Sequence, residues 1–132
     1  MSNATYRSGA LTFEIAQDIE KFTLVTVNED NKIAPATADG PVFGAITEPG
    51  SIDPRDEGND VLAVSYGQNV VKIRTDEDIA AGTAVYAAAD GKATAAGTTY
   101  VGTAYSEDGA VATKNGVVLV VLNGCPTRPD AA

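Results

Sequence analysis

The chain repeats part of its own sequence after sixty residues, and this repeat limits the folds that are open to it. Residues 17–36 read Q-D-I-E-K-F-T-L-V-T-V-N-E-D-N-K-I-A-P-A, and residues 77–96 read E-D-I-A-A-G-T-A-V-Y-A-A-A-D-G-K-A-T-A-A. Without gaps, the residues that recur are Asp18, Ile19, Thr23, Val25, Asp30, Lys32 and Ala36. Any strand-rich sequence resembles itself to some degree, but this run is ungapped and includes positions outside turns. It therefore predicts a duplicated supersecondary unit.

Short apolar or alternating segments bounded by turn residues predict an all-β barrel or sandwich. The expected strands are residues 10–15, 22–27, 32–35, 42–47, 61–66, 70–74, 84–88, 92–95, 100–105, 110–114 and 117–122. Asp90-Gly91 and Asn115-Gly116 are strong hairpin signals, and a hairpin is also expected at residues 67–69. Residues 18–21 are expected to form one helical turn capped by Asp18.

The length of 132 residues suits a single domain with a hydrophobic core. We expect an extended N-terminal arm at residues 1–9, a β domain at residues 10–122, and a Pro-containing C-terminal tail at residues 123–132. Within the domain, the repeat predicts two similar halves at about residues 10–64 and 70–122.

The charge balance disfavours several classes of partner. Nine Lys and Arg face eighteen Asp and Glu, which gives a formal net charge of −9. Binding to nucleic acid or to an anionic membrane surface needs clustered cations, so we expect neither partner. No stretch of apolar residues is long enough to predict a membrane-spanning helix.

The sequence offers little that supports catalysis. It contains no histidine, and its single cysteine, Cys125, has no histidine partner and forms no intrachain disulfide. An acidic loop holds Asp53, Asp56, Glu57 and Asp60, but their spacing matches no calcium loop. Asp76-Glu77-Asp78 is better explained as a charged turn than as a metal site. We expect no enzymatic activity, no catalytic residue, no cofactor and no metal.

One segment of the repeat carries a resemblance to a known family. Asp78–Val85 reads D-I-A-A-G-T-A-V, and strands with a glycine occur at Phe43-Gly44-Ala45-Ile46 and Val101-Gly102-Thr103-Ala104. With the closing segment Val117–Leu122, this pattern resembles the head decoration proteins of tailed phages, also called capsid cement proteins. The resemblance spans most of residues 10–122. Phe22 stands where the pattern prefers glycine, so the tight turn is expected to be altered in the first copy.

This resemblance implies a small β-barrel or β-tulip domain, often trimeric, that decorates a phage head. It implies a protein on the outer capsid surface of a virion assembled in the host cytoplasm, bound to the major capsid protein and stabilising the shell against internal DNA pressure. The expected capsid contacts are Tyr6, Arg7 and Arg55. Two alternatives stay open, which are a ligand-binding or sugar-binding module of β-clip type and another virion domain from a tail or fibre.

Overall fold

The computed structural model describes residues 10–53, 55, 59–107, 109, 111–114 and 116–122. These residues form strands and one short 3-10 turn, η1 (Ala89–Gly91), without any α-helix. The strands are β1 (Ala10–Ile15), β2 (Thr23–Val27), β3 (Lys32–Pro35), β4 (Gly44–Ile46), β5 (Val61–Ser65), β6 (Val70–Arg74), β7 (Ala84–Ala87), β8 (Ala93–Thr94), β9 (Tyr100–Tyr105), β10 (Thr113–Lys114) and β11 (Val117–Leu122). The prediction of a small all-β domain is confirmed.

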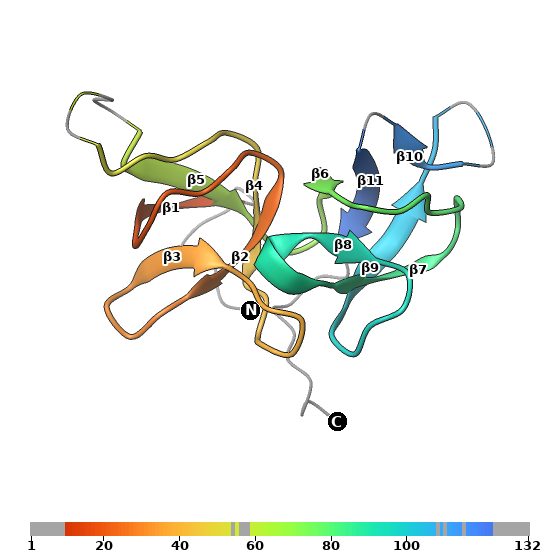
Figure 1. Ribbon diagram of the computed structural model, residues 1–132, viewed down its shortest axis with the longest axis horizontal. Helices are drawn as coiled ribbons and strands as arrows, with labels where there is room; N and C mark the ends of the chain where they lie inside the picture. The colour runs from red at the N-terminus through yellow and green to blue at the C-terminus, as the bar shows by residue number, and fades with distance from the viewer. Residues whose placement is uncertain are drawn as a thin grey trace, which may run out of the picture.

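The first five strands close a barrel in the order β1-β3-β2-β4-β5 (Figure 1). β1 and β3 run parallel, and the other neighbours in the ring are antiparallel. Alternation along the strands directs one set of apolar side chains inward. The barrel core contains Phe13, Ile15, Ile19, Val25, Ile33, Ile46, Leu62 and Val64.

The remaining strands form a second sheet whose pairing follows that of the barrel. Its order is β10-β11-β9-β7-β8, and β6 also pairs with β11. Val25 lies opposite Gly44 in the barrel, and Val85 lies opposite Gly102 in the second sheet. A parallel bridge between Thr75 and Ala93 repeats the Ile15–Ile33 pair sixty residues later and joins the ends of β6 and β8. The repeated sequence therefore corresponds to a repeated pattern of strand pairing.

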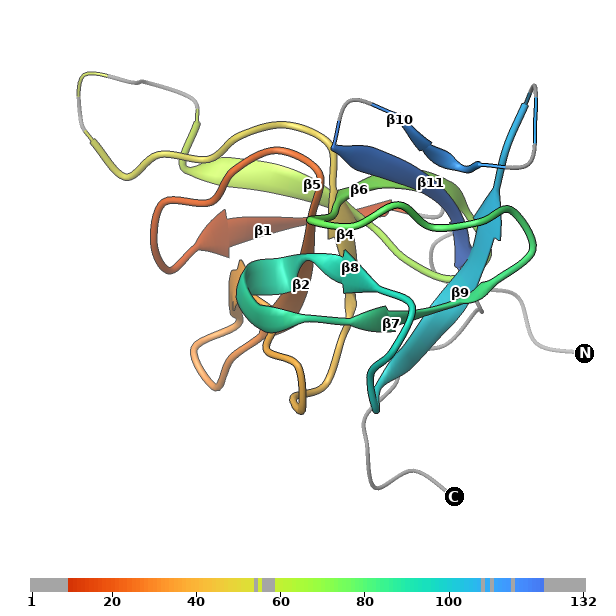
Figure 2. The ribbon, with the colours of Figure 1, turned by 45° about the vertical axis from the view of Figure 1, so that its right-hand side comes forward.

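The two halves lie side by side and share a hydrophobic core (Figures 1 and 2). Leu24, Ala36, Val42 and Ala45 come from the first half, but they pack with the buried residues of the second. Thr23, Leu24 and Val25 are consecutive residues of β2, and all three are fully buried. Consecutive side chains of a strand point to opposite faces. β2 is therefore covered on both faces, by the barrel core on one side and by the second half on the other.

Two local predictions were wrong. Residues 18–21 form no helical turn, because Ile19 pairs with Gly50 and Asp18 Oδ1 accepts the N–H of Ile52 at 2.9 Å. Residues 67–69 form no hairpin, because β5 pairs with β1 and β4 while β6 pairs with β11. In both cases a partner distant in sequence replaces the local one. The Asp90-Gly91 hairpin is confirmed, with φ of 60° and 70° at its two turn residues.

The expected change at the first copy of the tight turn was also wrong. Phe22 has a φ of 59° and Gly82, its equivalent sixty residues later, has a φ of 83°. Both residues therefore adopt the left-handed conformation, although a side chain makes this conformation unfavourable by about 1–2 kcal/mol. The first copy therefore has the same turn as the second, and Phe22 adopts a strained backbone conformation that glycine adopts without strain.

Candidate functional site: a cationic groove between the two halves

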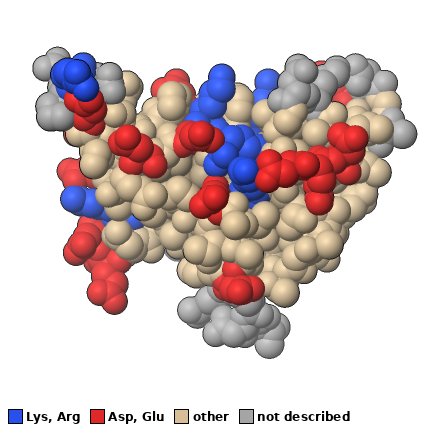
Figure 3. All heavy atoms as spheres, viewed as in Figure 1, with Lys and Arg blue, Asp and Glu red and all other residues tan. Residues whose placement is uncertain are grey.

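A hollow of about 740 Å³ opens where the turn before β2 meets the outer face of the second sheet. We call it the cationic groove. Its lining includes four of the nine Lys and Arg of the chain, which are Lys21, Lys72, Arg74 and Lys92. Figure 3 shows Lys and Arg side chains gathered near the centre of one face, with acidic side chains on either side. A chain with a net charge of −9 therefore presents a local concentration of positive charge.

Phe22 lies at the end of the groove that the first half contributes. Its backbone is left-handed, and its ring lies close to the side chain of Lys72 on β6. The Nζ atoms of Lys21 and Lys72 lie 5.3 Å and 5.7 Å from the ring centroid. Both distances are within the range of a cation–π interaction. The ring thus holds a lysine from each half over its face.

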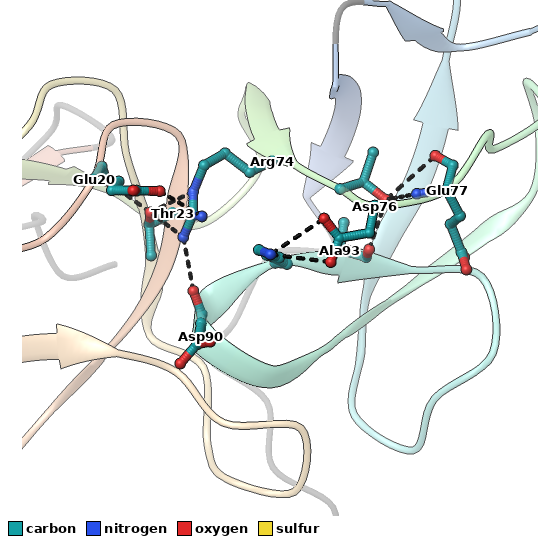
Figure 4. A network of polar contacts seen from close by, with 9 residues as sticks. Glu20, Thr23, Arg74, Asp76, Glu77, Asp90 and Ala93 are labelled. Atoms are coloured by element: carbon teal, nitrogen blue, oxygen red, sulfur yellow. Dashed lines mark hydrogen bonds and ion pairs between the residues drawn. The ribbon is translucent and has the colours of Figure 1, made fainter.

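Arg74 joins the two halves (Figure 4). Its guanidinium donates to the Thr23 hydroxyl at 3.1 Å and to the Asp90 carbonyl oxygen at 2.8 Å, and it forms an ion pair with Glu20 at 2.6 Å. Its backbone N–H donates to the carbonyl oxygen of Phe22 at 2.7 Å. Charge-assisted hydrogen bonds are among the stronger ones in proteins, so Arg74 fixes the position of the turn against β6.

The four cations differ in how much of their charge is compensated. Arg74 is paired with Glu20, and Lys92 is paired with Asp76 at 3.0 Å. Neither Lys21 nor Lys72 forms an ion pair with any residue that the structure describes. Both side chains belong to exposed residues, so two ammonium groups are available to an incoming anion.

The floor of the groove is the outer face of the second sheet. Lys72 lies opposite Leu119, and Leu119 lies opposite Tyr105 on the next strand. Tyr105 is 47% exposed and Val111, at the far wall, is 57% exposed. The groove therefore combines cationic and apolar surfaces, a composition that suits an acidic ligand with apolar parts.

Of the predicted contact residues Tyr6, Arg7 and Arg55, only Arg55 is among the described residues. Tyr6 and Arg7 fall outside the described residues, as do Cys125, Asp56 and Glu57. Arg55 is described, and its side chain is 89% exposed and forms an ion pair with Asp53 at 2.8 Å. The hydrogen bond from Arg55 lowers the pKa of Asp53 and raises the pKa of Arg55. Among the described residues, no group of three or more acidic or cysteine side chains is placed to hold a metal ion.

Sequence reasoning missed the cationic groove. Phe22 and Tyr105 line the groove, and neither was predicted to be a site residue. A local signal was present at Phe22, where the equivalent residue of the second half is Gly82. A side chain is not needed for this turn, because Gly82 makes the same turn without one.

Comparisons with known proteins give one informative result. No family model and no curated protein matches the chain. The fold is similar to the crystal structure of the N base of the head fiber gp8.5 in bacteriophage phi29, with a TM-score of 0.63 and 17% sequence identity. The match covers 86% of this chain and 92% of that chain, so it includes both halves. No helix of the described residues is long and apolar enough to cross a membrane.

Proposed function

We propose that this protein is a non-enzymatic structural component of a phage virion that binds the outer surface of the head. The observation that carries the proposal is the likeness to the phi29 head fiber base over 86% of the chain. The resemblance of the repeat to capsid cement proteins points to the same part of a virion.

In its finer form, the proposal is a decoration role on the shell. The protein would bind the major capsid protein as a homotrimer, brace the contacts between capsomers and stabilise the head against internal DNA pressure. A small β domain hides exposed strand edges by pairing them with neighbours, which favours self-association. Tyr6, Arg7 and Arg55 are the proposed contacts, since an aromatic and arginines are residue types that anchor interfaces.

The test is co-sedimentation of the purified protein with undecorated heads of the phage that encodes it. We expect saturable binding and a higher temperature of DNA release from filled heads. Light scattering of the free protein should give the mass of a trimer. If the protein stays in the supernatant at micromolar concentration, the assignment to the head surface fails.

The cationic groove favours a second candidate, a ligand-binding β module. Its volume of about 740 Å³ lies within the usual range for ligand sites. A sugar-binding role would need a small saccharide to bind in the groove without heads present. Calorimetry against acidic and neutral saccharides separates this candidate from the first.

A further inference from the structure

We propose that the cationic groove is a docking site for an acidic segment of another protein of the phage head. The class of partner rests on the proposed function, whereas the location and the charge of the site rest on the groove itself. Carboxylates of the segment would meet Lys21 and Lys72, and its apolar side chains would lie on Leu119 and Tyr105.

The internal repeat provides the first argument, because it shows what the fold itself requires at these positions. The barrel pair Thr12–Ala63 has the same register as the pair Lys72–Leu119 in the second sheet. Likewise, Glu14 lies opposite Val61 where Arg74 lies opposite Val117. The barrel forms with Thr12, Ala63 and Glu14 on this face. The larger or cationic residues at the corresponding positions of the second half, which are Lys72, Leu119 and Arg74, are therefore not needed for strand pairing.

Phe22 provides the second argument. Gly82 makes the same turn in the second half without a side chain, and a Cβ at Gly82 would have no atom within 4 Å. Phe22 retains the unfavourable left-handed conformation and places its ring against Lys21 and Lys72. Backbone strain of this kind concentrates at binding sites, where the surrounding structure maintains it. Phe22 is thus a positioning residue for the two unpaired lysines.

Charge decides between a protein and a nucleic acid as the occupant. The unpaired ammonium groups of Lys21 and Lys72 attract acidic groups at short range, although the whole chain is acidic. However, Asp76 and Glu107 line the same groove, and they would repel a phosphate backbone with a charge at every nucleotide more than a segment whose few carboxylates lie at Lys21 and Lys72. The exposed apolar floor also suits a polypeptide better than a polyphosphate, because apolar side chains gain by leaving water. An acidic protein segment that also carries apolar residues satisfies both features.

The experiment compares two variants of equal charge change in the full chain. Lys72→Glu alters the groove, and Lys32→Glu alters β3 of the barrel, where Lys32 forms a 3.9 Å ion pair with Glu14. Four probes are used. They are undecorated heads, a fluorescent peptide of alternating glutamate and leucine, the same peptide with glutamine in place of glutamate, and a double-stranded DNA oligonucleotide.

We expect the glutamate peptide to bind the wild-type protein, to bind more weakly as salt rises, and to bind better than the glutamine peptide. Lys72→Glu should weaken peptide and head binding about tenfold or more, and Lys32→Glu should change either by less than about threefold. Phe22→Gly should weaken peptide binding with the domain still folded, as circular dichroism would show.

The outcomes separate the groove from the proposed function. If heads bind wild type and Lys72→Glu equally and the glutamate peptide does not bind, the docking proposal fails and the head assignment stands. If the peptide binds with the expected dependence on Lys72 but heads do not bind, the groove is an acidic-peptide site and the head assignment fails. DNA binding that is stronger than peptide binding and is lost in Lys72→Glu would overturn the choice of a protein partner.

Discussion

Gly44 and Gly102 occupy equivalent places in the two halves, each pressed against the backbone of the neighbouring strand. A Cβ on Gly44 would lie under 3.0 Å from the Ser65 carbonyl oxygen, and a Cβ on Gly102 would lie under 3.0 Å from that of Val121. The next nearest atoms are the Cγ1 atoms of Val64 and Val120, both at 2.9 Å. The same close approach of a glycine to the neighbouring strand therefore occurs in the barrel and in the second sheet.

Alanine at either glycine is expected to destabilise the domain. Gly44→Ala and Gly102→Ala each force backbone apart in a packed core, and overpacking of this kind costs about 1–3 kcal/mol. Urea unfolding at neutral pH measures the loss. Gly109→Ala is the control, because a Cβ there has no atom within 4 Å. Unchanged stability in both core variants would contradict the close approach.

Removing the Phe22 side chain should reveal the backbone strain. Phe22→Gly and Phe22→Ala both lose the ring, but only alanine keeps a Cβ in the left-handed conformation. We expect the glycine variant to be the more stable of the two by about 1 kcal/mol, the reverse of their usual order outside such conformations. Gly82→Ala should lose a similar amount. Thermal unfolding of the three variants tests this, and an alanine variant as stable as the glycine variant would argue against a strained turn.

Arg74 should contribute more to stability than an ordinary surface cation. Arg74→Met removes its bonds to Thr23 and Asp90 and its ion pair with Glu20. We expect a loss of about 1–3 kcal/mol in denaturant unfolding, because hydrogen bonds to a charged group are stronger than neutral ones. Lys32→Met removes only an exposed pair and should cost less than about 1 kcal/mol. Equal effects of the two variants would show that Arg74 does not hold the halves together.

The pKa of Asp53 should depend on Arg55. The pKa of Asp53 is lowered in the folded state by its bonds from Arg55. Its contribution to stability is therefore present above the ordinary pKa of an aspartate and is lost as pH falls through the lower folded value. Arg55→Ala removes the guanidinium but keeps the backbone N–H of residue 55, which also donates to Asp53, so an NMR titration should show the Asp53 pKa rise toward its ordinary range. A pKa unchanged from that of the wild-type protein would mean that the guanidinium does not cause the shift.

The proposed arm offers a prediction about binding. Deletion of residues 2–9 should leave the β domain folded, because the first strand starts at Ala10. It should also weaken binding to heads, since an arm that adds a strand to a neighbour gains backbone hydrogen bonds there. Co-sedimentation with undecorated heads and circular dichroism measure the two effects. If the truncated protein decorates and protects heads as well as the full chain does, the arm is not part of the interface.

The sequence alone determined the features that depend on neighbouring residues or on the repeat. Short apolar or alternating segments bounded by turn residues predicted β1, β3, β6, β9 and β11 with their observed bounds. The Asp90-Gly91 hairpin followed from turn chemistry, because both residues tolerate a positive φ. The sixty-residue repeat gave the recurrence of strand pairing, since equal patterns favour equal registers.

Only the tertiary structure decided how distant segments meet. The helical turn predicted at residues 18–21 does not form, because Ile19 pairs with Gly50. The hairpin predicted at residues 67–69 does not form, because β6 pairs with β11. The cationic groove depends on Arg74 reaching Thr23, fifty-one residues earlier in the chain. Nothing in either segment indicates the other, since side-chain contacts of this kind carry no sequence period. The charge of the groove was hidden for the same reason, because composition sums charges over the whole chain while the fold selects which of them become neighbours.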